Sequence, residues 1–258
     1  MTGPKIRLHV EQPLAAGQAI ALSEAQANYL FAVMRLGPGA AVHLFNGRDG
    51  EWQAEVAEAG KRRGILVCRA QTAPQGAPPD VWLVFVPVRK DRTAFMVEKA
   101  VELGAARLVP VSTRRMNAER MRIDKHQAHA TEAAEQCEAT WVPEVAALQP
   151  LERLLTGWDP ARRLYWADED LARHAAGGDP AAPAAAGARA GAPVSPPARG
   201  ERAAILIGPE GGFTTEERAL LRGLPFVSPL SLGPRILRAE TAALAALTLW
   251  QASAGDWR

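Results

Sequence analysis

The stretch AAILIGPEGGFTTEERALLRGL, residues 203–224, has the order of a strand, a glycine-rich turn and a helix. Its first residues are apolar, as in a strand buried on both faces of a parallel sheet. Thr214 and Glu217 have the spacing of a capping box, which predicts that a helix begins there. The glycines before them let a backbone approach a ligand closely, and the start of the helix adds unpaired N–H groups. The stretch therefore predicts a ligand-binding turn at the carboxyl end of a strand.

A second strand, turn and helix follow in LSLGPRILRAETAALAALTLW, residues 230–250, with Gly233 in the turn. One such turn could be only a tight connection, because ordinary turns are rich in Gly and Pro. Two in succession at the carboxyl ends of strands favour a ligand crevice. Neither turn matches the dinucleotide fingerprint or the phosphate loop, and neither contains a Lys. We therefore expect backbone amides and carbonyls to bind the ligand.

The same alternation precedes these two units. VWLVFVPV (81–88) is an apolar run of strand length, residues 91–104 have helical spacing, and RLVPVST (107–113) is a second strand. A long helix over about 124–138 and the strand RRLYWAD (162–168) continue the series. Strands that alternate with helices predict an α/β domain with a parallel sheet.

Residues 1–72 have a different character, with short strands separated by turns. NGRDG at 46–50 is typical of a hairpin turn, and Ser23 is the expected N-cap of a single helix. A segment rich in Pro and Gly follows, so we place a small β domain at 1–72 and the α/β domain at 73–258. Within the second domain, residues 175–201 are dominated by Ala, Pro and Gly and are predicted to be a disordered loop insertion.

Composition excludes several classes of protein. The 258 residues are 48% apolar and 22% charged, as is normal for a globular protein. No apolar run reaches the roughly 18 residues of a membrane span, and the first residues lack the apolar core of a secretory signal. Cys68 and Cys137 are expected to be reduced thiols in the cytoplasm, and no group of side chains has the spacing of metal ligands. A net charge of +2 is too small to indicate nucleic-acid binding by itself.

Five stretches together carry a resemblance to a known family. IGPEGGFTTEE (207–217) followed by LGPRILRAETAALAAL (232–247) closely resembles the C-terminal motifs of the RsmE family. EKAVELGAARLVPVSTRR (98–115) and EAAEQCEATWVPEV (132–145) match further stretches in the same order, and VMRLGPGAAVHLFNG (33–47) resembles the family's PUA-like domain. Members are SPOUT-class methyltransferases that modify N3 of a uridine in 16S ribosomal RNA of the small subunit.

The resemblance implies a small PUA-like β-barrel followed by a SPOUT-type α/β domain with a deep trefoil knot. It also implies a homodimer with the last helix at the interface, where we expect the stripe Ala243, Leu244, Leu247 and Trp250 to pack. The implied cofactor is S-adenosylmethionine, cradled by the backbone of the knot loops. The residues expected to hold it are Leu206, Ile207, Gly208, Pro209, Glu210, Gly211, Gly212, Leu230, Ser231, Leu232, Gly233, Ile236, Leu237 and Thr241.

Methylation of uracil requires loss of the N3 proton and stabilisation of negative charge on the uracil oxygens. Arg238 and Glu240 are the candidates for these tasks, although Glu240 could instead serve the helix dipole or a salt bridge. Glu135 and Gln136 are expected near the active centre. The family usually has a pattern like EQCGR at that point, whereas this chain has Glu138 and Ala139 after its cysteine.

Arginines and one lysine are the candidates for RNA contact, because phosphates bind basic side chains whatever the base sequence. Several of them follow predicted strands, at the functional edge of a parallel sheet, and Arg235 could alternatively hold the carboxylate of the cofactor. The candidates are Arg7, Arg35, Arg48, Arg89, Lys90, Arg92, Arg114, Arg115 and Arg235.

Three other functions are considered. One is an enzyme that binds another nucleotide cofactor in a Rossmann-like sheet, which the absence of the GxGxxG motif disfavours. Another is a SPOUT methyltransferase that acts on a different RNA. The third is a non-catalytic RNA-binding factor in ribosome assembly, disfavoured because both glycine-containing turns are intact.

Overall fold

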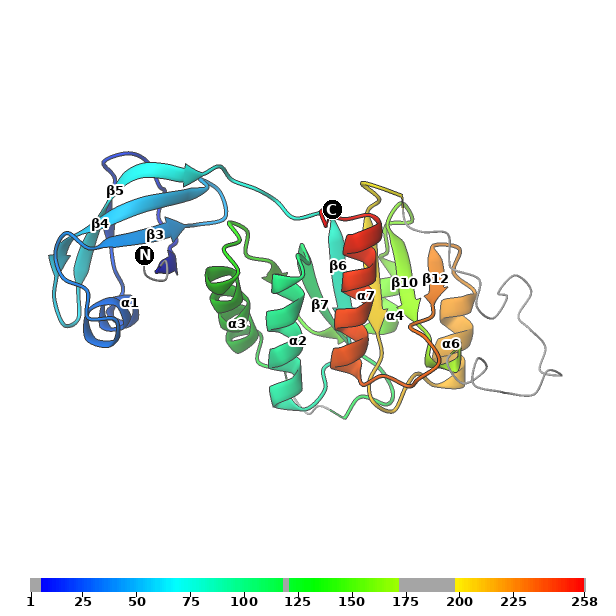
Figure 1. The fold of residues 1–258 in the computed structure, drawn as a ribbon. Coiled ribbons are helices and arrows are strands. Elements are labelled where there is room, and N and C mark those ends of the chain that lie inside the picture. Colours follow the sequence, from blue (N-terminus) through cyan, green and yellow to red (C-terminus); the bar gives the residue numbers. More distant parts are fainter. Residues whose placement is uncertain (1–5, 118–120, 172–197, 258) are drawn as a thin grey trace. The chain divides into compact units, whose positions relative to one another are not determined.

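The computed structural model describes residues 6–117, 121–171 and 198–257. The chain divides into two compact units, one formed by Met1–Ala77 with Ala134–Val142, the other by Pro78–Ala133 with Pro143–Arg258 (Figure 1). Of the predicted insertion at 175–201, only residues 198–201 lie within the described part of the chain. No described helix is both long and apolar enough to cross a membrane.

The first unit is built on a five-stranded sheet in the order β1-β3-β4-β5-β2. Its neighbours are antiparallel except for the parallel pair β1 and β3. Alternate residues of the strands point into one core, which includes Val42, Leu44 and Leu66. The strands are β1 (Arg7–His9), β2 (Ala19–Ala21), β3 (Ala41–Phe45), β4 (Glu51–Ala59) and β5 (Gly64–Ala73).

Local signals fix the helix and the first hairpin of this unit. Ser23 and Gln26 form a capping box at the start of α1 (Glu24–Ala27), which confirms the predicted N-cap. The chain then widens into the π-helix η1 (Asn28–Val33). The predicted turn at 46–50 joins β3 to β4, and the side-chain oxygen of Asn46 accepts hydrogen bonds from the backbone of Arg48 and Asp49.

Arg7 attaches residues 134–142 to the first unit. Its guanidinium donates to Glu51 at 2.6 Å, and to the carbonyl oxygens of Ala134 and Ala139 at 2.7 and 2.8 Å. Only 4% of Arg7 is exposed, so these are buried, charge-assisted hydrogen bonds. A segment that is distant in sequence thereby becomes part of the β unit.

The second unit contains a sheet in the order β12-β10-β11-β6-β7-β8, with β9 also pairing with β7. Every pairing is parallel, which confirms the predicted α/β architecture. Of the central strands, β11 is buried at every residue and β6 at every residue except Trp82, as their continuous apolar runs predict. The strands are β6 (Val81–Phe85), β7 (Arg107–Ser112), β8 (Glu144–Val145), β9 (Gln149–Pro150), β10 (Arg163–Ala167), β11 (Ala203–Ile207) and β12 (Val227–Leu230).

The named helices of this unit are α2 (Lys90–Glu102), α3 (Ile123–Gln136, whose last turn belongs to the first unit), α4 (Leu151–Thr156), α6 (Thr215–Arg222) and α7 (Ala239–Ser253). Helix α7 packs against α2 and β11 (Figure 1). Ala243 and Leu247 are fully buried and Trp250 is 4% exposed. Three of the four residues expected at a dimer interface are therefore buried within the chain's own core, whereas Leu244 is half-buried, and the interface stays a prediction.

Candidate functional site

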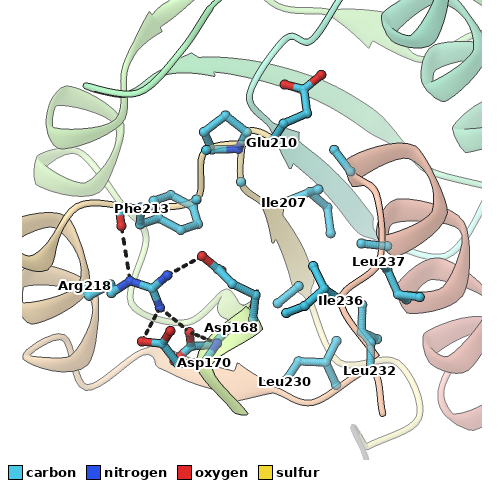
Figure 2. A pocket seen from close by; sticks show the side chains of 18 of the residues that line it. Asp168, Asp170, Ile207, Glu210, Phe213, Arg218, Leu230, Leu232, Ile236 and Leu237 are labelled. Carbon is cyan, nitrogen blue, oxygen red and sulfur yellow. Dashed lines mark hydrogen bonds and ion pairs between the residues drawn. The ribbon is translucent and has the colours of Figure 1, made fainter. Parts of the chain in front are cut away.

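A cavity of about 670 Å³ opens where β10, β11 and β12 end. Its walls are the loop at 208–212, the loop at 230–238, the acidic residues 168–170 and the inner face of α6 (Figure 2). In an open parallel sheet this edge is where ligands bind. The two glycine-containing turns predicted from the sequence thus meet at one cavity.

The loop at 208–212 has no room for side chains at two of its glycines. A Cβ at Gly208 would lie 2.6 Å from the ring of Phe213, which is 1% exposed and meets Trp166 edge to face. Gly212 has a φ of +67°, and a Cβ there would collide with the carboxylate of Glu169. Only glycine fits this backbone without displacing its surroundings.

Residues after β7 brace the same loop. Arg115 donates from Nη1 to the carbonyl oxygen of Gly211 at 3.0 Å and lines the cavity. The backbone N–H of Arg114 donates to Oε1 of Glu217 at 2.9 Å. Glu217 also completes the predicted capping box with Thr214, so that box is confirmed and connects two loops.

The start of α6 stabilises negative charge. Backbone and Thr214 hydrogen bonds to Glu216 hold the pKa of that carboxyl below its usual range.

Helix α7 begins differently, because Arg238, its N-cap residue, supplies no side-chain cap. Its first N–H groups lie beside the cavity, where Ala239 and Ala242 form part of the lining. An anionic group of a ligand would be favoured at that helix end.

A charged network closes one side of the cavity (Figure 2). Arg218 donates to Asp168 at 2.6 Å, pairs with Asp170 at 2.7 Å, and is also in contact with Glu169. Arg222 donates to the second oxygen of Asp168 at 3.2 Å. Side-chain exposure is 2% for Asp168 and 12% for Arg218, so the central pair is buried. The network fixes the chain after β10 to α6.

Sequence analysis missed this network. The acidic residues 168–170 directly follow a predicted strand, which was a usable signal, because carboxyl ends of parallel strands gather at one edge. Their partner Arg218 is 50 residues from Asp168, and no local pattern connects the two.

The opposite wall is apolar and open. It presents Leu230, Leu232, Ile236 and Leu237, which lie across the cavity from Phe213 and Arg218 (Figure 2). Ile236 is 57% exposed, although it is a large aliphatic side chain. A flat apolar ring bound in the cavity would cover these side chains.

Most of the predicted cofactor residues line this cavity. Leu206 does not, because it is fully buried in the core cluster below the sheet edge. Ser231 and Thr241 are exposed and also lie outside the lining. Those that line the cavity are Ile207, Gly208, Pro209, Glu210, Gly211, Gly212, Leu230, Leu232, Gly233, Ile236 and Leu237.

The two candidate catalytic residues are separated. Arg238 lines the cavity, whereas Glu240 does not. Glu240 instead forms an ion pair with Arg92 of α2 at 3.6 Å, and its side chain is 13% exposed. Its Oε2 atom is buried, with no hydrogen-bond partner among the described residues. The salt-bridge alternative for Glu240 is the one that matches this geometry.

The candidates for RNA contact fall into distinct groups. The expectation that Arg7 contacts RNA is wrong, since its buried guanidinium already binds Glu51 and backbone carbonyls and is not open to phosphate.

The other candidates are divided between the two units. Arg35 and Arg48 are exposed in the first unit, and Arg48 also donates to the carbonyl of Glu11 at 2.7 Å. In the second unit Arg115 and Arg235 line the cavity. Arg89, Arg92 and Arg114 lie outside its lining, and the side chain of Lys90 is outside the described part.

Neither residue of the EQ motif, Glu135 or Gln136, lines the cavity. A carboxylate oxygen of Glu135 accepts a hydrogen bond from the backbone of His9 at 2.8 Å, so it belongs to the first unit and not to the cavity. Glu138 has a φ of +61°, the left-handed region that favours glycine. This is the position at which the EQCGR pattern of the resembled family has its glycine.

Comparisons with known proteins agree with this geometry. Residues 75–251 match the family described as the RNA methyltransferase domain, and residues 22–67 match the RNA methyltransferase PUA domain. The ribosomal RNA small subunit methyltransferase E of Rickettsia conorii is 27% identical over 246 residues, with 93% of each chain covered.

Two solved structures share the fold over almost the whole chain. A putative methyltransferase of Legionella pneumophila, in complex with the cofactor SAM, is 28% identical with a TM-score of 0.80 and covers 99% of this chain and 100% of its own. The ribosomal RNA small subunit methyltransferase E of Neisseria gonorrhoeae, bound to S-adenosyl methionine, is 24% identical with a TM-score of 0.81 and the same coverage.

Proposed function

Because the chain belongs to the RNA methyltransferase family, we propose that it transfers a methyl group from S-adenosylmethionine to N3 of a uridine in 16S ribosomal RNA. The observation that carries the proposal is the meeting of two glycine-containing loops at one cavity beyond β10, β11 and β12. The relative from Rickettsia, which matches along 93% of its length, supports the small ribosomal subunit as the source of the substrate.

The cavity suits the cofactor in size and in the chemistry of its lining. About 670 Å³ lies within the range of roughly 300–1,000 Å³ typical of small-molecule sites. Leu232, Ile236 and Leu237 would hold the adenine, and the backbone of the 208–212 loop would approach it closely. Arg235 and the uncapped start of α7 offer a place for the carboxylate. When bound, S-adenosylmethionine supplies an electrophilic methyl group.

Arg238 is the residue that we propose to act on the acceptor. It lines the cavity at the start of α7. A cation beside the uracil oxygens stabilises the negative charge that develops as N3 loses its proton to solvent water. The same charge orients the base, so Arg238 contributes to both positioning and charge stabilisation.

We propose that Glu240 is a positioning residue, which holds Arg92 at the carboxyl edge of the sheet. Arg89 is exposed at the same edge. Glu240→Gln and Arg92→Ala should each raise KM for RNA, and the double variant should add little. The dependence of kcat on pH should stay that of the unchanged enzyme. A general base would behave otherwise, because Glu240→Gln would then lower kcat and remove the acidic limb of that profile.

We further propose that the enzyme works as a homodimer in the cytoplasm, where its ribosomal RNA is assembled. Since Ala243, Leu247 and Trp250 of α7 are buried within the chain, the exposed Leu249, 51% accessible, is the better candidate for a dimer contact on that helix. Mass determination at micromolar concentration should give a dimer, and Leu249→Glu should shift it toward monomer. A wild-type protein that is monomeric at that concentration would contradict the dimer.

The central experiment combines calorimetry with nucleoside analysis. Titration with S-adenosylmethionine should show binding, and incubation with small-subunit RNA should yield N3-methyluridine after digestion and mass spectrometry. Arg238→Ala should lower kcat about 100-fold while cofactor affinity is retained. Cofactor binding with a different methylated nucleoside would overturn the assignment of the substrate. Absence of cofactor binding would favour the non-catalytic RNA-binding factor.

A further inference from the structure

We propose that the end of the first unit formed by the turn at 60–63 and the π-helix η1 binds single-stranded RNA. Phosphates would contact Lys61, Arg62 and Arg63 of that turn, and a base would stack on Tyr29 of η1. The inference rests on the proposed function, since it concerns how the RNA substrate is held. It assigns RNA contact to residues that sequence analysis did not single out.

The fold places η1 beside this turn. The N–H of Leu22, just before the helix, donates to the carbonyl of Gly64 at 3.0 Å. Phe31 of η1 packs so closely on Gly64 that a Cβ there would collide with its ring. Arg62 and Glu24 of α1 form an ion pair at 3.1 Å. Two segments about 30 residues apart in sequence thus form one continuous surface.

This surface is basic. Three successive exposed side chains, Lys61, Arg62 and Arg63, project from the tip of the β4–β5 hairpin. The ion pair of Arg62 joins side chains that are 84% and 67% exposed, so it is worth little and a phosphate can replace it. The other carboxylate near the tip is the exposed Glu58 of β4. Positive charge therefore predominates at the hairpin tip, which favours phosphate.

The surface also carries exposed apolar groups. Tyr29 and Met34 are each 36% exposed and Val33 is 61% exposed. A hydrogen bond from the N–H of Met34 to the carbonyl of Tyr29, at 2.9 Å, widens the helix and bends the chain there. Such π-turns are frequent at functional sites. The helix that packs against the basic turn thus carries an exposed aromatic side chain, and unpaired bases are held by stacking on such a ring while basic residues neutralise their phosphates.

Arg35 extends the surface beyond η1. It is exposed and has a φ of +57°, which is unfavourable for a long side chain. Backbone held in that region at a surface is a reason to look for function. Of the arginines that sequence analysis suggested for RNA contact in this unit, Arg35 is the one that lies next to η1.

Arg69 provides a control outside the proposed surface. It lies on β5, five residues beyond Gly64, so about 17 Å of extended chain separates it from the turn. Its guanidinium forms an exposed ion pair with Glu55 at 3.1 Å, as that of Arg62 does with Glu24. Arg62→Ala and Arg69→Ala therefore remove the same charge from the same kind of ion pair, one inside and one outside the proposed surface.

The test measures the affinity of the full chain for a fluorescent single-stranded oligouridylate over a range of salt concentrations. Replacing Lys61, Arg62 and Arg63 together by Ala should weaken binding at least tenfold and reduce the salt slope by about two units, at roughly 0.7 per lost phosphate contact. Tyr29→Ala should weaken binding about tenfold with the slope unchanged. Arg62→Ala alone should reduce the slope by about 0.7, whereas Arg69→Ala should leave the slope unchanged and the affinity within twofold of the wild type. An unchanged slope in the triple variant, or an effect of Arg69→Ala equal to that of Arg62→Ala, would overturn the inference.

Controls separate this inference from the proposed function. Circular dichroism and calorimetric titration with S-adenosylmethionine should be unchanged in all variants, because the cavity lies in the other unit. If the wild type methylates ribosomal RNA and the triple variant binds RNA normally, the surface is wrong and the function stands. If the triple variant loses RNA affinity while no methylated uridine is formed by any variant, the surface stands and the function is wrong.

Discussion

The two loops that form the walls of the cavity are held in opposite ways. The loop at 208–212 is fixed on several sides, by Arg115 at Gly211, by Glu169 against Gly212, and by Phe213 against Gly208. Residues 231–237 include no buried residue, and we find no hydrogen bond from them to any described residue. We therefore expect the first wall to be formed before a ligand arrives and the second to be ordered by the ligand.

The difference assigns different tasks to the two walls. A preformed cradle lowers the entropy cost of binding and aligns the ligand. An open apolar loop such as that around Ile236 gains its contacts only when it closes on a bound group. Loss of a contact in the first wall should therefore reduce stability, and loss of an apolar side chain from the second should reduce affinity alone.

Loss of Arg218 should have the largest effect. Arg218→Met leaves Asp168, with a side chain only 2% exposed, without its main partner. Removing one member of a buried ion pair typically costs about 3 kcal/mol or more of unfolding free energy. Arg235→Met, on the second wall, is the control and should leave stability within about 0.5 kcal/mol. Urea denaturation of both variants tests this, and equal midpoints would remove the distinction between the walls.

The next largest effect on stability is expected at two glycines of positive φ, one in each wall. Gly212→Ala and Gly233→Ala each place a Cβ on a backbone of positive φ, +67° and +97°, which costs about 1 kcal/mol or more. At Gly212 the new Cβ also collides with the carboxylate of Glu169, whereas no atom lies within 4 Å of a Cβ at Gly233. We expect about 2 kcal/mol or more of destabilisation and loss of cofactor binding for Gly212→Ala.

For Gly233→Ala we expect about half that destabilisation, with binding retained. Denaturation and calorimetric titration measure both quantities. If the Gly233 variant proves the less stable of the two, the second loop is more rigid than its contacts indicate.

The contrast between the walls also explains how far the sequence could predict this site. The capping box at Thr214 and the glycines of the first wall are local signals, because their spacing alone requires a particular backbone. The apolar run of β11 similarly indicates a strand buried on both faces. These features were predicted at their correct positions, and so was the cavity between the two turns.

Tertiary contacts decided the features that sequence analysis missed or misplaced. Arg7 could not be recognised as buried, because its partners Glu51, Ala134 and Ala139 are 44 to 132 residues away. An apolar stripe on a helix predicts burial but not its partner, and α7 buries its stripe against α2 and β11. The deep knot and the dimer remain expectations from the resemblance.

A smaller effect is expected at Ile236, and it should concern affinity alone. Ile236→Ala removes apolar surface that is 57% exposed before the ligand binds. Burial of that surface under the cofactor would be worth about 1 kcal/mol, so affinity should fall about fivefold with no change in stability. Leu220→Ala is the control, since Leu220 is 38% exposed on α6 and lies outside the cavity. An equal loss of affinity in both variants would contradict the assignment of Ile236 to the ligand.

The smallest effect is one that requires no substitution. Amide hydrogen exchange reports local opening, which is fast where backbone hydrogen bonds are absent. Residues 231–238 should exchange rapidly in the free protein and slow markedly on addition of S-adenosylmethionine, because the ligand supplies the contacts that the loop lacks. Residues 203–207 of β11 should be protected in both states, since the strand is paired on both sides. Strong protection of 231–238 without ligand would mean that both walls are preformed. The two walls would then differ only in the chemistry of their side chains.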